Sequence, residues 1–136
     1  MTAKTLMVAS TTRLQLRSAR FLLPFSLAVL KIRRQALRAP GNLGIKLRKS
    51  QGLAFWTKTL WASEAALIDF HTNNPHQNNK PHIHNWCDEA AHAHWPSAET
   101  SLPNWHEAEQ ALIKYGSLPR LDYPSADHRA GTIVIR

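Results

Sequence analysis

The order of strand-like and helix-like segments is the feature that most constrains how this chain can fold. Alternating apolar and polar residues are typical of a half-buried strand, and apolar residues three or four positions apart are typical of a helix. The alternating pattern occurs in four segments, which are residues 4–16, 43–48, 53–61 and 88–95. The helical pattern occurs over residues 20–38 and again from Ser63 to about His71. The predicted order is therefore β-α-β-β-α-β.

Turn and capping residues support these boundaries. Ala39-Pro40-Gly41 would stop the first helix, because proline and glycine are typical of helix ends. Ser50-Gln51-Gly52 is a turn signal between two strand patterns, so residues 43–61 are predicted to form a β-hairpin. Ser63 is a good N-cap for the second helix. Between that helix and the last strand we expect a short helix or an ordered loop over residues 76–87.

This order is typical of the ferredoxin-like arrangement, an α+β fold with a four-stranded antiparallel sheet. Its helices cover one face of the sheet, so the other face needs a cover of its own. An aromatic-rich open face predicts either a ligand or a second subunit as the cover. A second subunit is the commoner of the two, and we therefore expect a homodimer. We predict a ferredoxin-like domain over residues 1–96 and a C-terminal tail over 97–136, with a helix at 104–115 and a candidate final strand at 132–135.

The charge of the chain is unevenly distributed. The net charge is +8, the first acidic residue is Glu64, and twelve basic residues precede it. Such an asymmetry can mark a surface for nucleic acid or for an anionic membrane, but no nucleic-acid motif accompanies it. A solvated helix face with basic strand ends is the simpler interpretation, and we expect no nucleic-acid partner.

The single cysteine, Cys87, excludes an internal disulfide and any zinc site built from several cysteines. It favours a reducing compartment, so we expect a cytoplasmic protein. Residues 1–35 have the basic, acid-free composition of an organellar transit peptide, but the apolar run over 21–30 continues into an amphipathic helix and is interpreted as part of the domain. That run is also too short for a membrane span, which needs about 20 apolar residues.

Residues 86–95 combine two tryptophans, the only cysteine, two acids and two histidines. On a strand, Asp88, His92 and His94 share one face. A buried ionisable group must find a partner, so a strand of this composition could line a cavity. His92 and His94 would lie about 6.5–7 Å apart at their Cα atoms, and Asp88 or His76 could supply a further metal ligand. Nothing in the sequence fixes that geometry, and we expect no metal site.

Several motifs of the chain match one family pattern. They are Arg13-Leu14 in the first strand, Arg34 through Gly41 at the end of the first helix, Phe55 through Trp61, Ser63-Glu64-Ala65-Ala66 with Phe70, Pro75-His76, and Asn85 through Trp95. With these motifs the chain resembles the dimeric α/β-barrel superfamily that includes the antibiotic-biosynthesis monooxygenase-like proteins, and within it uncharacterised bacterial members and spheroidene-monooxygenase-like proteins. The resemblance covers about residues 4–95. Residues 77–84 depart from the pattern, because they are polar and add His82 and His84.

The resemblance implies a homodimer whose subunits pack sheet to sheet, each with a small-molecule pocket between its sheet and its helices. Its most specific implication is a monooxygenase that needs no cofactor and acts on an enolisable or phenolic substrate. Two alternatives stay open. One is a haem-binding or haem-degrading module with His76 as the ligand, and the other is a non-catalytic dimeric module.

His94 and His76 are the predicted catalytic residues, because both fall on positions shared with the resembled family and histidine can transfer protons near neutral pH. Asp88 joins them as a residue that could orient a histidine. A structural role for His94, bonded to Asp88 or to the backbone, is equally compatible with the sequence. The predicted substrate-binding set is one cation for an enolate or carboxylate and four aromatic walls, namely Arg13, Trp56, Trp61, Trp86 and Trp95.

Overall fold

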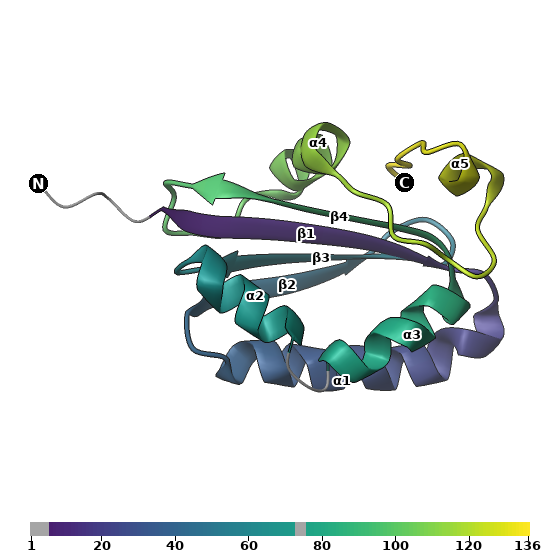
Figure 1. Cartoon of the computed structure of the whole chain (residues 1–136), viewed down its shortest axis with the longest axis horizontal. Helices are drawn as coiled ribbons and strands as arrows, with labels where there is room; N and C mark the ends of the chain where they lie inside the picture. Colours follow the sequence, from purple (N-terminus) through teal and green to yellow (C-terminus); the bar gives the residue numbers. More distant parts are fainter. Residues whose placement is uncertain (1–5, 73–75) are drawn as a thin grey trace, which may run out of the picture.

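The sheet has β1 at its centre, between β3 and β4. The computed structural model describes residues 6–72 and 76–136, and for residues 76–80 it describes the backbone alone. Within these ranges the neighbouring strands are antiparallel and follow the order β2-β3-β1-β4 (Figure 1). The strands are β1 (Met7–Leu16), β2 (Asn42–Lys49), β3 (Ala54–Trp61) and β4 (Cys87–Ser97). The predicted ferredoxin-like topology is confirmed.

The helices lie at the predicted places along the chain, except for the short helix α5, which falls in a segment expected to be an irregular connection. They are the short 3-10 helix η1 (Ala19–Phe21), α1 (Leu22–Arg38), α2 (Glu64–Thr72), α3 (His76–Trp86), α4 (Trp105–Tyr115) and α5 (Ala126–Arg129). The segment left open as a helix or an ordered loop is the helix α3. Asn104 caps α4, because its side chain accepts a 2.8 Å hydrogen bond from the backbone N–H of Glu107. No helix in the described part of the chain is long and apolar enough to cross a membrane.

Gly41 explains the sharp connection between α1 and β2. Its φ is 85°, a backbone conformation that glycine adopts without the steric cost of a side chain. A Cβ atom at this position would lie 2.7 Å from the Cβ atom of Ala66 on α2. The backbone oxygen of Gly41 also accepts a 2.7 Å hydrogen bond from the N–H of Ala62. Gly41 therefore turns the chain and lets α2 approach the start of β2.

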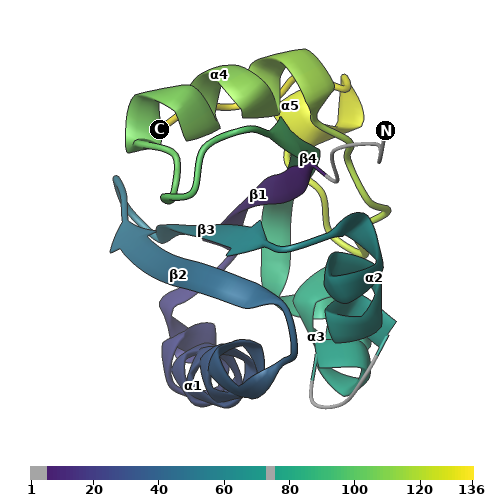
Figure 2. The same cartoon turned by 90° about the vertical axis from the view of Figure 1, so that its left-hand side faces the viewer.

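Each face of the sheet has its own core. On the face towards α1, α2 and α3, one cluster contains Val8, Ala36, Trp61, Leu67 and Phe70, and another contains Leu16, Phe25 and Cys87. On the opposite face, the cluster contains Trp56, Ala91, Ala93 and Leu112, with Trp95, Trp105, Leu118, Ile133 and Ile135 packed against it. Figure 2 shows the resulting three layers, with α4 and α5 above the sheet and the other helices below it.

The predicted final strand over residues 132–135 is wrong, because this segment joins no sheet. Ile133 and Ile135 pack instead on the core cluster that contains Trp56 and Leu112. The segment crosses the face of the sheet rather than extending one of its edges. Its apolar residues therefore serve side-chain packing and not strand pairing.

Charged groups help to hold α4 on the sheet. The Trp105 ring lies near two cations, with the Lys58 Nζ atom 4.4 Å and the Arg48 Cζ atom 4.5 Å from its centre. Lys58 Nζ also donates a 2.7 Å hydrogen bond to the carbonyl oxygen of Pro103, just before α4. Burial lowers the pKa of Lys58, and the neighbouring charges of Lys46 and Arg48 add to this effect.

The layer formed after β4 covers the face that was expected to meet a second subunit. Because α4 and the segments around it belong to the same chain, the apolar sheet face is buried without a partner. A sheet-to-sheet contact between two copies would require this layer to move away. The homodimer itself stays a prediction.

Candidate functional site

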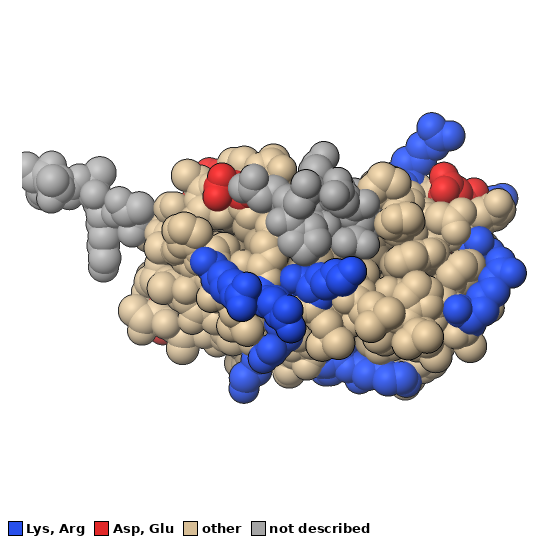
Figure 3. Space-filling view, turned by 90° about the horizontal axis from the view of Figure 1, so that it is seen from below, with Lys and Arg blue, Asp and Glu red and all other residues tan. Residues whose placement is uncertain are grey.

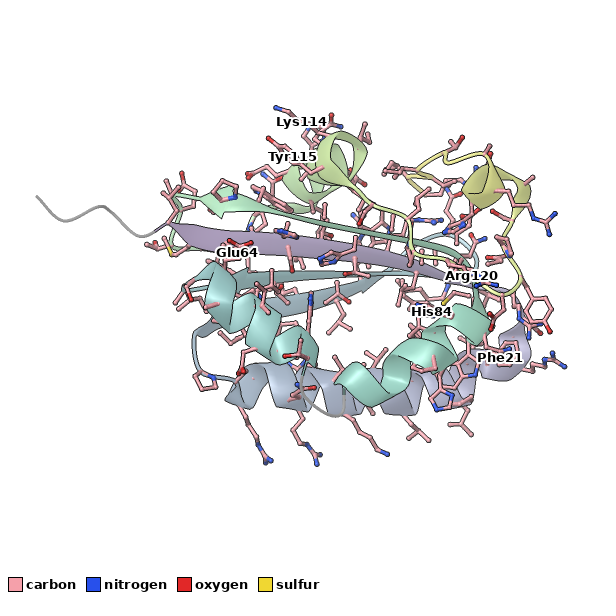
Figure 4. All side chains as sticks on the ribbon, viewed as in Figure 1. Phe21, Glu64, His84, Lys114, Tyr115 and Arg120 are labelled. Atoms are coloured by element: carbon pink, nitrogen blue, oxygen red, sulfur yellow. The ribbon has the colours of Figure 1, made fainter. Side chains whose placement is uncertain are left out.

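A cavity lies between the sheet and the helices α1, α2 and α3. Its volume is about 420 Å³, which is within the range of small-molecule sites. Its apolar wall includes Leu14, Ala28, Val29, Ile32, Ile45, Leu47, Phe70, Ile83 and Ala90. Its polar lining includes Ser10, Thr12, Arg33, Thr57, Thr59, His71, His84 and His92. Figure 4 shows His84 on α3, below the sheet.

The strand register places five of these polar groups in two neighbouring rows across the floor of the cavity. Thr12 on β1 is paired with Thr57 on β3 and with His92 on β4. Directly opposed residues on neighbouring strands have Cβ atoms only about 4.5–5.5 Å apart, so their side chains meet on the same face. Ser10, two residues earlier on β1, is paired in the same way with Thr59 and His94. The polar residues that interrupt the apolar pattern of β1 therefore form the cavity floor.

Hydrogen bonds fix the side chains of this floor. Thr12 Oγ1 lies 2.9 Å from Nδ1 of His92. The hydroxyl groups of Ser10 and Thr59 bond to each other, and Thr59 Oγ1 accepts a 2.9 Å hydrogen bond from Nε1 of Trp61. A threonine hydroxyl can donate to a neutral imidazole nitrogen or accept from a protonated one. The contact between Thr12 and His92 can therefore persist when the ring gains or loses a proton.

Two further histidines lie beside His92. His71, from α2, meets it edge to face with the ring centres 5.2 Å apart, and it also lines the cavity. His94 follows on the same strand with a ring distance of 5.8 Å, but it is exposed and is not part of the lining. The three rings thus form a short series from the cavity to the surface. Imidazole is the side chain that exchanges protons most readily near neutral pH.

The predicted catalytic residues are not brought together in this cavity. His94 is exposed and does not line the cavity, and the side chain of His76 lies outside the described residues. Asp88 sits where the pairing of β1 and β4 shifts, and its Oδ1 atom accepts a 3.0 Å hydrogen bond from Nε2 of Gln15. The haem interpretation depends on His76, so it stays a prediction.

Most of the predicted substrate-binding residues lie elsewhere in the fold. Arg13, Trp56 and Trp95 are on the opposite face of the sheet, under α4 and the final segment. Trp61 is fully buried beside the cavity in the core cluster with Phe70 and is not among the lining residues.

Trp86, at the end of α3, packs outside the cavity. Its ring stacks on the His82 ring with the ring centres 5.2 Å apart, and the centre of the Phe21 ring lies 6.4 Å from the centre of the Trp86 ring. The indole therefore joins α3 to the start of α1, and it is not part of the cavity lining.

Arg13 is buried and bonded to neighbouring groups, so its guanidinium is not open to a substrate. It is 2% exposed, and its Nη1 atom lies 3.0 Å from Oε1 of Glu89. Its Nε atom donates a 3.1 Å hydrogen bond to the backbone oxygen of Arg136. Ser125 Oγ donates to the second carboxylate oxygen of Glu89 at 2.9 Å. The guanidinium therefore connects the sheet to the segments that cover it.

Cys87 is buried against Leu16 and Phe25 and lies outside the cavity lining. Burial raises the pKa of its thiol to about 12, and the negative charge of Asp88 adds to the rise. The thiol is therefore protonated at neutral pH and is a poor nucleophile. Among the described side chains, no group of three or more histidine, cysteine or acidic residues is placed to hold a metal ion.

Sequence reasoning missed the role of Thr12 and considered His92 only together with His94, as a candidate pair of metal ligands. It also did not single out His71. A signal was present, because Ser10 and Thr12 interrupt an otherwise apolar strand on the face that carries Val8 and Leu14.

Comparisons with known proteins find likeness in structure alone. No family model and no curated protein sequence matches the chain. The solved structure of SnoaB from Streptomyces nogalater, described as a cofactor-independent oxygenase, superposes with a TM-score of 0.58 at 14% identity, over 72% of this chain and 98% of that one.

Two further structures are described as candidate antibiotic biosynthesis monooxygenases. The protein from Nitrosomonas europaea gives a TM-score of 0.62 at 12% identity, over 72% of this chain and 96% of its own. The protein from Caulobacter crescentus gives 0.61 at 15% identity, over 70% and 92%. The chain therefore shares the fold of these proteins. Because nearly all of each matched chain superposes on about seven-tenths of this one, the remainder has no counterpart in them.

Proposed function

We propose that this chain, which shares the fold of monooxygenase-like proteins, binds a small and largely apolar molecule in the cavity between its sheet and its helices. We further propose that it oxygenates an enolisable or phenolic substrate without a cofactor. The observation that carries the proposal is the position of His92, which lines a cavity with a largely aliphatic wall and whose Nδ1 atom lies 2.9 Å from Thr12 Oγ1. The shared fold with a structure described as a cofactor-independent oxygenase supports the same reaction class.

The proposed reaction starts with proton transfer from the substrate to His92. The resulting carbanion or enolate gives one electron to dioxygen, and the two radicals combine to form a carbon–oxygen bond. Loss of water from the peroxide then converts a CH₂ group into a carbonyl group. One oxygen atom enters the product, the other leaves as water, and the substrate supplies all the electrons.

The cavity supplies two conditions that this reaction needs. Its aliphatic wall, from residues such as Val29, Ile32 and Ile45, would limit the contact of water with the reactive intermediate. The Thr57 hydroxyl lies in the same row as Thr12 and can donate a hydrogen bond to the oxygen on which negative charge develops. Both features act on the substrate and require no further group.

The neighbouring histidines complete the proposal. His71 meets the His92 ring inside the cavity, and the exposed His94 lies beside it on the solvent side. We assign His94 the transfer of protons between His92 and water. This retains the predicted involvement of His94, but as a residue that acts through His92.

The test combines ligand binding with oxygen uptake, and a hydroxyanthrone serves as the probe because its CH₂ group is acidic. The unmodified chain should bind the probe, seen as quenched tryptophan fluorescence, and should consume oxygen. His92→Ala should abolish oxygen uptake, and Thr12→Val should lower kcat more than it changes KM. His106→Ala is the matched control, because His106 is exposed on α4, across the sheet from the cavity. Oxygen uptake that survives His92→Ala at full rate would refute the proposed catalytic role.

Binding and catalysis can be separated with a further variant. Ala90 lies on β4 in the cavity lining, so Ala90→Phe should fill part of the space and weaken binding of the probe. If the probe binds the Ala90→Phe variant as well as it binds the unmodified chain, the cavity is not the binding site. If the probe binds but no oxygen is consumed, the chain is a binding module and the oxygenase proposal fails.

A further inference from the structure

The outer face of α1 carries a stripe of leucines that no described element covers. Leu23 is 71% exposed, Leu27 52%, Leu30 61% and Leu37 52%. With a helical step of roughly 100° per residue, the four side chains fall within a sector of about 80°. That sector lies opposite the residues of α1 that are buried against the sheet, Phe25, Ala28 and Ala36. α1 therefore has two apolar faces, and the outer one meets solvent.

The leucine stripe, as we call these four residues, lies among cations. Arg34 falls within its sector, and Lys31 and Arg38 lie along one edge; all three are exposed. No acidic residue occurs in the chain before Glu64. Figure 3 looks onto this side of the molecule and shows lysine and arginine side chains spread over it, with acidic side chains confined to its margins. The surface that complements this face is apolar and anionic.

A second copy of the chain does not meet this requirement. A two-fold contact through α1 would pair the same patch with itself, as every isologous interface does. Arg34, Lys31 and Arg38 of one copy would then face the same cations of the other, with no carboxylate on α1 to separate them. The charge of the patch therefore opposes self-association through this helix.

The shape of the patch favours a flat partner. Figures 1 and 2 show α1 on the outer side of the molecule, with α3 beside it and no described element beyond it, so the stripe faces outwards. A helix of this kind, with leucines on its outer surface and lysine or arginine beside them, can lie in the plane of a membrane with its apolar side chains at the boundary of headgroups and acyl chains. We propose that α1 docks this chain on an anionic lipid surface.

Two quantitative expectations follow from this proposal. Each cation near an anionic membrane contributes about fivefold to binding, so reversing Arg34 and Arg38 should weaken vesicle binding by at least about 25-fold. Each leucine that enters the interface contributes about tenfold or more, so Leu27→Ser with Leu30→Ser should weaken it by about 100-fold. Raising the salt concentration should also release the protein, because the electrostatic part is screened.

The experiment is co-sedimentation of the full chain with vesicles of phosphatidylcholine that contain phosphatidylglycerol, compared with vesicles of phosphatidylcholine alone. We expect binding to the anionic vesicles, strong loss in the Leu27→Ser/Leu30→Ser and Arg34→Glu/Arg38→Glu variants, and little binding to the neutral vesicles. Ile113→Ser is the matched control, because Ile113 is 54% exposed but lies on α4, on the other side of the molecule. It should bind like the unmodified chain.

Other outcomes would overturn the proposal. They are absence of binding to the anionic vesicles, equal binding to both vesicle types, and equal loss in the Ile113→Ser variant. Self-association that depends on Leu27 and Leu30 without vesicle binding would assign the stripe to a second copy. Retention on heparin without vesicle binding would assign the cations to a soluble polyanion. Circular dichroism checks that each variant is folded. If the leucine variant unfolds, the charge variant still tests the proposal, because it alters exposed side chains alone.

Discussion

Replacing Glu89 by alanine tests whether the covering layer is held by a buried charge. Glu89 and Arg13 form an ion pair of 3.0 Å, with side chains that are 7% and 2% exposed. The same carboxylate accepts a 2.9 Å hydrogen bond from Ser125 in the segment after β4. Glu89→Ala therefore removes the charge partner of a buried guanidinium and one attachment of the covering layer together.

The expected loss of stability follows from burial. Removing one partner of a buried ion pair costs about 3–5 kcal/mol, because the remaining charge stays away from water without compensation. Arg13 keeps two other acceptors, Gln15 Oε1 at 3.4 Å and the backbone oxygen of Arg136 at 3.1 Å. Because these acceptors remain, we expect Glu89→Ala to lower the free energy of unfolding by about 3 kcal/mol, the lower end of that range.

The chain offers a matched control on the same side of the sheet. Arg48 and Glu109 form a pair of 3.2 Å, but their side chains are 29% and 28% exposed. Glu109→Ala should therefore cost only about 0.2–1 kcal/mol, because water and salt screen the pair. Unfolding in urea, followed by circular dichroism, gives both free energies. Equal losses in the two variants would refute the argument from burial.

The double variant Arg13→Met/Glu89→Leu separates the charge from the packing. It removes both charges and fills the space with apolar groups, so it should recover most of the stability that Glu89→Ala loses. Limited proteolysis gives a second measurement, since cleavage between β4 and Arg136 should increase in Glu89→Ala and not in Glu109→Ala. A double variant as unstable as Glu89→Ala would mean that the carboxylate acts mainly through Ser125.

Three further predictions concern the thiol, a turn and the covering layer. With its pKa raised to about 12, the Cys87 thiol should react with iodoacetamide at pH 8 about 1,000-fold more slowly in the folded chain than in urea. Because the pKa is raised in the folded chain, the contribution of the protonated thiol to stability is complete below about pH 9 and is lost towards pH 12. The difference in stability between the unmodified chain and Cys87→Ala should therefore shrink over that range. Gly41→Ala should destabilise the chain by about 1–3 kcal/mol in thermal unfolding, because its φ is 85° and the new Cβ would lie 2.7 Å from Ala66. Gly52→Ala, with a φ of 60° and no atom within 4 Å, should cost less, and the opposite ranking would contradict this account. Trp105→Ala should loosen α4, lower the melting temperature and produce concentration-dependent association in sedimentation velocity, and a variant that stays as stable and as monodisperse as the unmodified chain would count against the role of this ring.

The architecture could be predicted because local pattern and global fold agree. The alternation in β4 assigned the shared face of His92 and His94 correctly, and the turn residues set the ends of α1 and of the β2–β3 hairpin. The irregularity beside Asp88 could not be predicted, because a bulge depends on the pairing of two distant strands and not on local alternation. It displaces Asp88 from the regular pairing, and Leu16 pairs with Cys87.

The site was predicted only in part, because alternation alone does not say which elements cover each face. His94 pairs with Ser10, whereas Arg13 pairs with Trp56, and even and odd positions of β1 point to opposite sides. His94 and Arg13 therefore cannot meet in one pocket. That conclusion needs the register between β1 and β4, which a single sequence leaves free. The sequence also led us to expect a second subunit as the cover of this face, whereas the chain's own C-terminal segments cover it.

The cover over the second face of the sheet has a consequence for how the protein is made. Residues 98–136 are translated after all the strands, at about 5–20 residues per second, so they follow β4 by about 2–8 s. During that interval Trp56 and Ala93, which are buried in the complete fold, have nothing from their own chain above them. A nascent sheet of this kind can bind a chaperone or a neighbouring polypeptide in place of its own tail. The yield of soluble protein in cells would then depend on how quickly translation passes through α4.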